Sequence, residues 1–175
     1  MTRSYPKVFD DVFKVLLEFE GYLSNDAHDS GGLTKYGISQ RAYPTLDIKS
    51  LTVDDAKHIY YEDYFLKAKC NEMPTELACH VFDSAVNMGV SRATRFLQRT
   101  IKTSADGIFG RGSHAALKKH LAYHGEQRLV LDYLSYRAMF YSRLARLKPS
   151  QQKYLRGWLR RTYRLQQFVL NLDKK

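Results

Sequence analysis

This sequence predicts a mainly α-helical fold with one small β element. Apolar residues recur at three- and four-residue intervals along most of the 175 residues, whereas residues 33–39 are the one stretch typical of a short strand or hairpin arm. With 44% hydrophobic residues, a chain of this length can bury one good core but not two large independent domains. We therefore expect a single globule.

Start and stop signals place the individual helices. The first spans residues 7–20, between a proline and a glycine. Thr52 followed by Asp55 resembles a capping box, and Ser91 and Ser113 are candidate N-caps of later helices. We expect the further helices over residues 52–69, 74–89, 91–101, 113–121, 125–147 and 150–172.

The charge of the chain is strongly asymmetric. The net charge of +10 divides into −5 over residues 1–90 and +15 over residues 91–175. Such a field attracts a polyanion, which can be nucleic acid, anionic lipid or an anionic cell envelope. In the last helix we expect an apolar stripe of Leu155, Trp158, Leu159, Thr162, Leu165 and Val169, with an arginine ridge of Arg156, Arg160 and Arg164 on another face.

The sequence lacks the features of membrane proteins and of disulfide-rich proteins. Residues 1–20 contain charged residues throughout and have no apolar core typical of a signal peptide, and no later segment approaches a membrane-spanning length. We therefore expect synthesis in a cytoplasm. In that reducing compartment the two cysteines, Cys70 and Cys79, are expected to be buried thiols.

A glutamate at the end of the first helix is followed by a turn that contains more acidic residues. Glu20 lies where the helix carbonyls already carry negative potential, which is unfavourable for a carboxylate and therefore a mild sign of function. Asp26 and Asp29 follow it, before a Gly-Gly turn. Glycoside hydrolysis in most families uses two carboxyl groups, which Glu20 and Asp29 can supply. Spacing alone leaves a solvated turn as the alternative.

Several segments, taken in order along nearly the whole chain, resemble parts of one known protein family. They are residues 20–26 (EGYLSND), 29–32 (DSGG), 34–38 (TKYGI), 78–89 (ACHVFDSAVNMG), 97–98 (LQ), 106–110 (DGIFG) and 154–161 (YLRGWLRR). Together they resemble glycoside hydrolase family 108, the N-acetylmuramidases of phage and bacteria. The last segment resembles the end of the peptidoglycan-binding part that follows the catalytic part. Departures from the family signature at Tyr22, Leu23, Ala27 and Ser30 remove no carboxylate.

The resemblance implies a lysozyme-like fold, with a helical body and a small β-bearing lobe beside the active-site cleft. It also implies cleavage of the β-1,4 bond between N-acetylmuramic acid and N-acetylglucosamine, with Glu20 as general acid. That role requires partial burial against apolar neighbours, so that the carboxyl group stays protonated near neutral pH. We expect residues 1–95 to form the catalytic part and residues 96–175 a basic helical peptidoglycan-binding part, packed together as one globule.

The partners of the acid follow from similarity to phage-type lysozymes. Eight residues separate Glu20 from Asp29, as in those enzymes, so Asp29 is expected to position water; Asp26 is the rival second carboxylate. An inverting enzyme of this kind holds its carboxyl groups roughly 6.5–9.5 Å apart. A threonine follows after five more residues in those enzymes, but here Thr34 follows after four and Lys35 takes the fifth place. We favour Thr34, because its hydroxyl can hold water and strand neighbours point to opposite faces.

Other candidate residues have both functional and structural interpretations. Asn87 can bind an N-acetyl or hydroxyl group of the substrate, or serve as a helix C-cap. Tyr36 can line the cleft or pack. Residues 106–110 can contact glycan or form an inter-helix turn. His120 and His124 are four residues apart but have no convincing third ligand, so we expect no metal site and no cofactor.

Three further functions compete with a muramidase. The basic region from Arg137 to Arg164 is also typical of a nucleic-acid-binding module, but the acidic first half would repel phosphate, so we expect no nucleic acid partner. A lytic transglycosylase and a non-catalytic protein that binds the wall or assists secretion are the other two. The expected partners are peptidoglycan glycan strands and, through the basic helices, an anionic cell envelope. As a monomeric endolysin, the protein is expected to reach the wall in the periplasm after holin-type release.

Overall fold

The fold is seen in a computed structural model, which describes residues 3–20, 23–24 and 33–172, with the backbone alone at residues 20, 23 and 24. The chain divides into two compact units, Met1–Asp63 and Tyr64–Lys175. The prediction of a mainly α fold with one small antiparallel β element is confirmed. The division of function at residue 95 stays a prediction.

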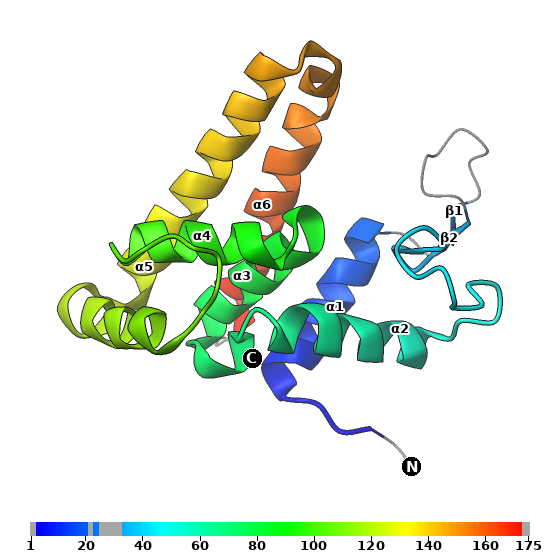
Figure 1. The fold of residues 1–175 in the computed structure, drawn as a ribbon, viewed down its shortest axis with the longest axis horizontal. Coiled ribbons are helices and arrows are strands. Elements are labelled where there is room, and N and C mark those ends of the chain that lie inside the picture. The colour runs from blue at the N-terminus through cyan, green and yellow to red at the C-terminus, as the bar shows by residue number, and fades with distance from the viewer. Residues whose placement is uncertain (1–2, 21–22, 25–32, 173–175) are drawn as a thin grey trace. The chain divides into compact units, whose positions relative to one another are not determined.

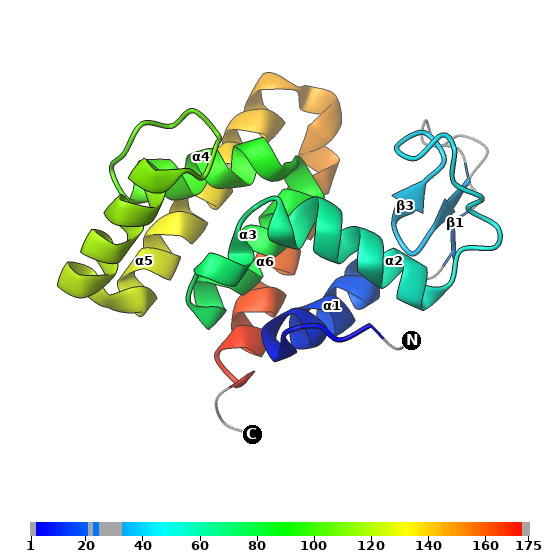
Figure 2. The ribbon, with the colours of Figure 1, turned by 60° about the horizontal axis from the view of Figure 1, so that its bottom comes forward.

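The first unit combines two helices and a small sheet (Figure 2). Helix α1, Lys7–Glu20, has the predicted bounds, and α2 is Val53–Tyr60. Aromatic rings join the helices, since the centroids of Phe13 and Tyr60 lie 5.8 Å apart. An ion pair of 2.8 Å between Lys57 and Asp10 adds to this packing. The apolar face of α1 thus forms part of the core of this unit.

The sheet has three very short antiparallel strands in the order β1-β2-β3. They are β1 (Leu23–Ser24), β2 (Thr34–Lys35) and β3 (Ile38–Ser39). The predicted hairpin over residues 33–39 corresponds to β2 and β3, whereas β1 was not predicted. Tyr36 and Gly37 form the two-residue loop, with φ of 53° and 78°. Two successive positive φ values are what the tightest hairpin loops require, and glycine at the second position adopts this without strain.

Helix α2 begins as predicted and ends earlier than predicted. The Thr52 hydroxyl accepts the Asp55 N–H at 3.1 Å, and the Asp55 carboxylate accepts the Thr52 N–H at 3.3 Å, which makes a reciprocal capping box. After Tyr60 the chain continues as a π-helical turn, Tyr61–Leu66. The expected helix to residue 69 was wrong, because the backbone has left the α conformation well before Lys69.

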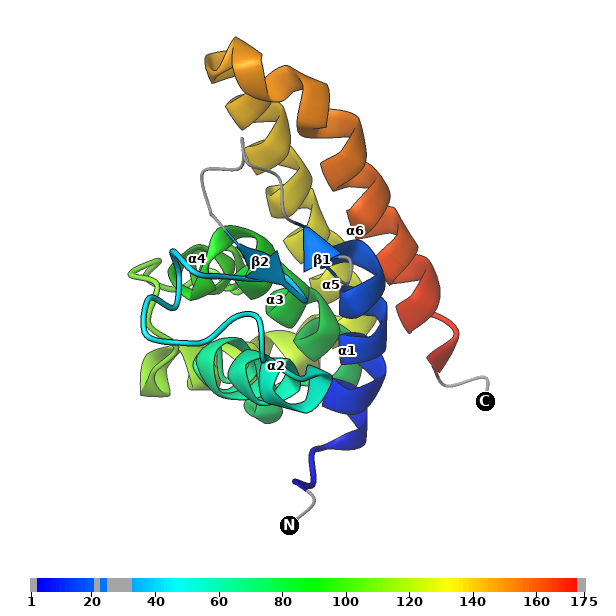
Figure 3. The same ribbon diagram turned by 90° about the vertical axis from the view of Figure 1, so that its right-hand side faces the viewer.

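The described part of the second unit consists of helices joined by turns and loops, with no strand. It contains a 3₁₀ turn η2 (Cys70–Glu72), helices α3 (Thr75–Met88), α4 (Val90–Thr100), α5 (Arg111–Leu147) and α6 (Leu155–Val169), and a second 3₁₀ segment η3 (Pro149–Tyr154). The second half of α5 and all of α6 lie side by side as a long hairpin joined by η3 (Figures 1 and 3). Gly125, with φ of 74°, divides α5 into two pieces, near the break that the sequence predicts.

Helix α3 is the centre of this unit, with every residue from Leu77 to Ala85 buried. Two predicted N-caps were wrong. Gly89 is the N-cap of α4, so Ser91 lies inside that helix. Gly110 is the N-cap of α5, so Ser113 lies inside α5. Cys70 and Cys79 are free, buried thiols. Among the described residues, none of the helices combines the length and apolar character needed to cross a bilayer.

Candidate functional site

Glu20 is the last residue of α1, in the first unit. The buried side of the helix comprises Phe9, Val12, Phe13, Val15 and Leu16. Its last turn contains no basic residue. The backbone therefore places Glu20 at the negative end of the helix dipole without a cation of the same turn beside it. The side chain of Glu20, and Asp26 and Asp29 altogether, lie outside the described residues, so the separation of the carboxyl groups stays a prediction.

The strand β2 places Thr34 and Lys35 differently. Thr34 is half-buried and stands opposite Ser39 in the β2–β3 register. The ammonium group of Lys35 donates a hydrogen bond of 2.9 Å to the backbone carbonyl of Lys49. Because adjacent residues of a strand point to opposite faces, Thr34 faces away from that contact. The preference for Thr34 as the water-holding residue stays a prediction.

Tyr36 lies in the hairpin loop next to these residues. Its backbone carbonyl accepts a hydrogen bond of 3.0 Å from the hydroxyl of Tyr60, which is buried. The Lys35 ammonium lies 5.5 Å from the centroid of the Tyr36 ring, within cation–π range. The hairpin thus brings Thr34 and Tyr36 together. The contact with α2 fixes the backbone of Tyr36, while a role of its ring in substrate binding stays a prediction.

Asn87 belongs to the second unit, near the end of α3. Its side-chain carbonyl accepts a hydrogen bond of 2.7 Å from the hydroxyl of Tyr141 on α5. The Tyr141 ring is stacked on Trp158 of α6, with centroids 5.1 Å apart. Gly89, not Asn87, is the C-cap of α3, so the capping interpretation was wrong. Asn87 thus links α3 to α5, and the Tyr141 ring in turn contacts α6. The proposed contact of Asn87 with substrate stays a prediction.

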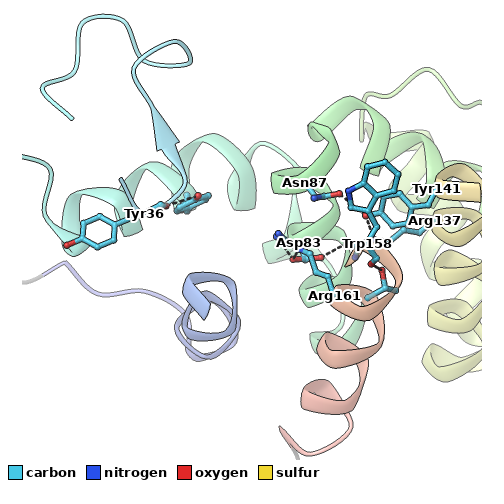
Figure 4. A network of polar contacts seen from close by, with 9 residues as sticks. Tyr36, Asp83, Asn87, Arg137, Tyr141, Trp158 and Arg161 are labelled. Atoms are coloured by element: carbon cyan, nitrogen blue, oxygen red, sulfur yellow. Dashed lines mark hydrogen bonds and ion pairs between the residues drawn. The ribbon is translucent and has the colours of Figure 1, made fainter. Parts of the chain in front are cut away.

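Asn87 is one end of a buried polar network around Asp83 (Figure 4). The Asp83 carboxylate accepts hydrogen bonds from two guanidinium groups: Nη2 of Arg137 at 2.5 Å and Nε of Arg161 at 2.9 Å. Asp83 is 1% exposed and Arg137 is fully buried. Arg137 also donates to the Tyr141 hydroxyl at 3.1 Å. A single carboxylate on α3 therefore holds both α5 and α6.

Sequence reasoning missed this network, because it assigned Arg137 to a basic outer surface. One signal was present. Asp83 lies between Phe82 and Ala85 on the apolar face of a predicted helix, and a buried carboxylate needs a paired cation. The sequence does not say which of the 28 lysines and arginines supplies it, since the partners are 54 and 78 residues away.

The two arginines control the charge state of Asp83. Burial by itself raises the pKa of this carboxyl group, but the charges and hydrogen bonds of Arg161 and Arg137 outweigh burial and lower the pKa to about 2. The carboxylate is therefore ionised near neutral pH. Its role is structural, because a general acid must carry a proton near neutral pH.

His80, one turn before Asp83, predicts an acid-sensitive fold. It is fully buried, and neither ring nitrogen makes a hydrogen bond of good geometry to a described residue, although the Gln166 side chain and the Asp83 charge partly favour its protonated form. Burial, followed by the charge of Arg137, lowers the pKa of His80 from 6.5 to about 4. Because the unfolded chain binds a proton below pH 6.5 and the folded chain does not, His80 contributes stability above pH 6.5 that is lost as pH falls to 4. We expect a loss of up to about 3 kcal/mol over this window.

Urea unfolding at pH 7, 5.5 and 4, followed by the fluorescence of Trp158, measures this loss. Trp158 is the chain's one tryptophan and stacks on the network, so it reports on the second unit. The matched control is His80→Gln, whose side chain does not titrate. The difference in unfolding free energy between wild type and variant should change with pH. If this difference stays the same from pH 7 to pH 4, the acid-dependent loss of stability does not come from His80.

Residues 106–110 form a rigid turn that is organised by a buried glutamine. The Gln98 side chain donates to the Asp106 carboxylate at 2.7 Å and to the Ile108 carbonyl at 3.0 Å, and accepts the Gly107 N–H at 2.8 Å. The turn exposes 73% of Ile108. The inter-helix turn interpretation is confirmed, and contact with glycan stays a prediction.

Gly107→Ala should destabilise this turn by about 1–3 kcal/mol. Gly107 has φ of 86°, and a Cβ atom there would clash with the Ser91 side chain and stand 3.0 Å from the Ser91 carbonyl oxygen. Thermal unfolding of the variant measures the cost. Gly112→Ala is the matched control, because Gly112 is helical and an added Cβ has open space. It should be neutral or slightly stabilising. Equal melting temperatures for the two variants contradict the prediction.

The two histidines on α5 lie close together, and the described residues supply no third ligand beside them. The ring centroids of His120 and His124 lie 4.7 Å apart. His120 is half-buried and His124 is exposed. Nowhere in residues 3–20 and 33–172 do three or more histidine, cysteine or acidic side chains gather as a metal site would require.

Comparison with known proteins also divides the chain in two, but between residues 89 and 92, so the first match extends into the second compact unit. Residues 13–89 match the family model of glycosyl hydrolase 108, and residues 92–163 match the model of a predicted peptidoglycan domain. The protein is therefore a peptidoglycan hydrolase of the glycoside hydrolase class. Its first segment belongs to the glycosyl hydrolase 108 family, followed by the peptidoglycan domain, so the resemblance found in the sequence is confirmed.

The fold has a counterpart among solved structures. The structure of Brucella abortus SagA is similar over 95% of this chain and 96% of that chain, with a TM-score of 0.80 and 23% sequence identity. At this identity the likeness shows the fold and not the activity. Curated proteins give no significant match to this chain.

Proposed function

We propose that the protein is an N-acetylmuramidase that cleaves the β-1,4 bond between N-acetylmuramic acid and N-acetylglucosamine. The observation that carries this proposal is the family match over residues 13–89, which includes Glu20 at the end of α1. Glu20 protonates the leaving glycosidic oxygen. Asp29 positions the attacking water on the other side of the sugar, and Thr34 holds that water.

The position of Glu20 supports its role as the acid. The end of a helix destabilises a negative charge, which favours the protonated carboxyl group that can donate to the leaving oxygen. If Asp29 activates water directly, the product has inverted anomeric configuration. Tyr36 and Asn87 are proposed to contact the sugar rings or their N-acetyl groups. The match of residues 92–163 supports peptidoglycan as the partner.

Mass spectrometry of digested peptidoglycan tests the proposal. Hydrolysis releases fragments with reducing N-acetylmuramic acid ends. Anhydro-muramic ends instead identify a lytic transglycosylase, which needs the acid but no water-holding carboxylate. Reducing N-acetylglucosamine ends identify cleavage of the other glycosidic bond. The absence of any released fragment identifies a protein that binds the wall without cleaving it, and each of these three results overturns the proposal.

Paired substitutions decide between the two candidate second carboxylates. We expect Asp29→Asn to lower hydrolysis at least about tenfold more than Asp26→Asn, because loss of a catalytic base costs about 10²–10⁴-fold whereas loss of a turn-bracing side chain does not. Rates of reducing-end release from purified sacculi measure this. The reverse order assigns the role to Asp26.

The biological setting is a separate proposal. An enzyme of this class can lyse a host cell from within, and synthesis in the host cytoplasm followed by holin-type release would bring it to the wall. Expression in a bacterium with and without a co-expressed holin tests this route. Lysis that depends on the holin supports it, and lysis at the same rate in both strains contradicts it.

A further inference from the structure

Helix α6 has one face that packs in the second unit. Thr162, Leu165 and Val169 are buried, and Trp158 stacks on Tyr141. Arg161 on the same side reaches Asp83. These contacts fix both the position of α6 and its rotation about its own axis. The residues that point the other way are therefore presented in a defined arrangement.

The opposite face of α6 carries a shallow, open groove of about 750 Å³, whose lining residues all belong to residues 152–167. Its walls are two parallel rows of side chains with four-residue spacing, which are neighbouring ridges on a helix surface. One row is apolar and the other cationic. The first comprises Leu155, Leu159 and Tyr163, the second Arg156, Arg160 and Arg164, and Gln152 and Gln167 lie at the ends. Leu155 and Leu159 belong to the predicted apolar stripe, and both are half-exposed.

The charge around the groove favours an anionic ligand. Residues 133–172 contain nine lysines and arginines and no aspartate or glutamate. Two of the nine, Arg137 and Arg161, share Asp83, while Arg156, Arg160 and Arg164 are exposed. No acidic side chain lines the groove. Three guanidinium groups one helical turn apart span about 12 Å, which is the reach of a short extended peptide.

We propose that this groove binds the peptide stems of peptidoglycan, with their carboxylates on the arginine row and their alanine methyl groups on the leucine and tyrosine row. The inference rests on the proposed substrate and names the part of it that the second unit recognises. The N-acetylated sugars that bear peptides are uncharged, so a cationic row has its partners in the peptides. The peptidoglycan domain match, residues 92–163, includes most of the groove.

A second groove in the same unit provides a matched control. It lies between α4 and α5, has a volume of about 670 Å³ and is also lined by three arginines, Arg99, Arg143 and Arg146, with Phe96, Tyr136 and Phe140 among its other residues. Its arginines come from two helices and do not form one row. Replacing three arginines there removes the same net charge from the same unit.

The test measures binding of the inactive Glu20→Gln protein to purified sacculi by co-sedimentation. Two triple variants are compared in this background: Arg156→Gln/Arg160→Gln/Arg164→Gln, and Arg99→Gln/Arg143→Gln/Arg146→Gln. Glutamine preserves helix propensity, and circular dichroism checks folding. We expect the α6 variant to bind about tenfold more weakly, which three lost charge contacts supply, and the control variant to bind within about twofold of the parent.

The substrate is varied as well as the protein. An amidase removes the alanine methyl groups and the peptide carboxylates but leaves one lactyl carboxylate on each muramic acid. Sacculi treated in this way should therefore bind the parent protein more weakly than intact sacculi do, without losing binding altogether. Vesicles of phosphatidylglycerol test the alternative of an anionic membrane surface. The inference is overturned if the parent binds stripped and intact sacculi equally, if the two triple variants lose equal affinity, or if only vesicle binding depends on the α6 arginines.

Failure of this inference is distinguishable from failure of the proposed hydrolysis. Binding is measured on a protein that does not cleave, so it does not depend on the bond that the active protein hydrolyses. A wild-type protein that releases no reducing muramic ends, but whose inactive form binds peptides through α6, refutes the muramidase proposal alone. A protein that has muramidase activity but binds sacculi independently of the α6 arginines refutes the groove proposal alone.

Discussion

Glu20→Gln should lower peptidoglycan hydrolysis by about 10²–10⁴-fold. Glutamine keeps the shape of the side chain, but its amide is too weak an acid to transfer a proton to the leaving glycosidic oxygen. Glu20 ends α1, whose last turn has no basic residue, so the substitution also relieves an unfavourable negative charge. We therefore expect the variant to be at least as stable as the wild type while losing activity.

Glu18→Gln is the matched control. Glu18 lies on the same helix two residues earlier and is exposed, so its replacement removes the same charge from α1 without removing the proposed acid. Rates of reducing-end release from sacculi and melting temperatures are compared for both variants. Equal activity of Glu20→Gln and Glu18→Gln would falsify the assignment of the acid.

Asp83→Asn should cost about 3–5 kcal/mol of unfolding free energy. The substitution is nearly isosteric but removes the negative charge that compensates the buried guanidinium of Arg137 and the largely buried one of Arg161. Urea unfolding followed by Trp158 fluorescence reports on this unit, because Trp158 stacks on Tyr141 beside the network. Urea is preferred to guanidinium chloride because it does not screen ion pairs.

Asp132→Asn is the matched control for Asp83→Asn. Asp132 also pairs with an arginine, Arg128 at 2.9 Å on the same helix, but both side chains are substantially exposed. Exposed pairs of this type contribute less than about 1 kcal/mol. A cost for Asp83→Asn as small as that for Asp132→Asn contradicts the structural role of the network.

Elements with local signals were predictable from the sequence. Helix α1 lies between a proline and a glycine, and the Thr52–Asp55 capping box starts α2 as expected. The strand β1 has two residues, too few to show alternation. The π-helical turn Tyr61–Leu66 has no known sequence signal, since its residues suit an α-helix equally well. The length of α2 was therefore overestimated.

The site residues also divide into those that have a local sequence signal and those that do not. Glu20 was identified from an unfavourable position at a helix end, which is local information. The polar network was not, because Arg137 and Arg161 are ordinary members of a basic surface until the fold brings them to Asp83. Leu155 and Leu159 continue the apolar stripe of α6 in sequence, but the stripe is wider than the surface that α3 and α5 can cover.

The network around Asp83 also sets the order in which the second unit can be completed. Asp83 is translated 54 residues before Arg137 and 78 residues before Arg161. Until the ribosome has delivered both cations, a helix whose residues 77–85 are all buried in the finished protein carries an uncompensated charge. Contacts of such long sequence separation form late and slowly. We therefore expect the second unit to complete its tertiary packing only after α6 has emerged from the ribosome.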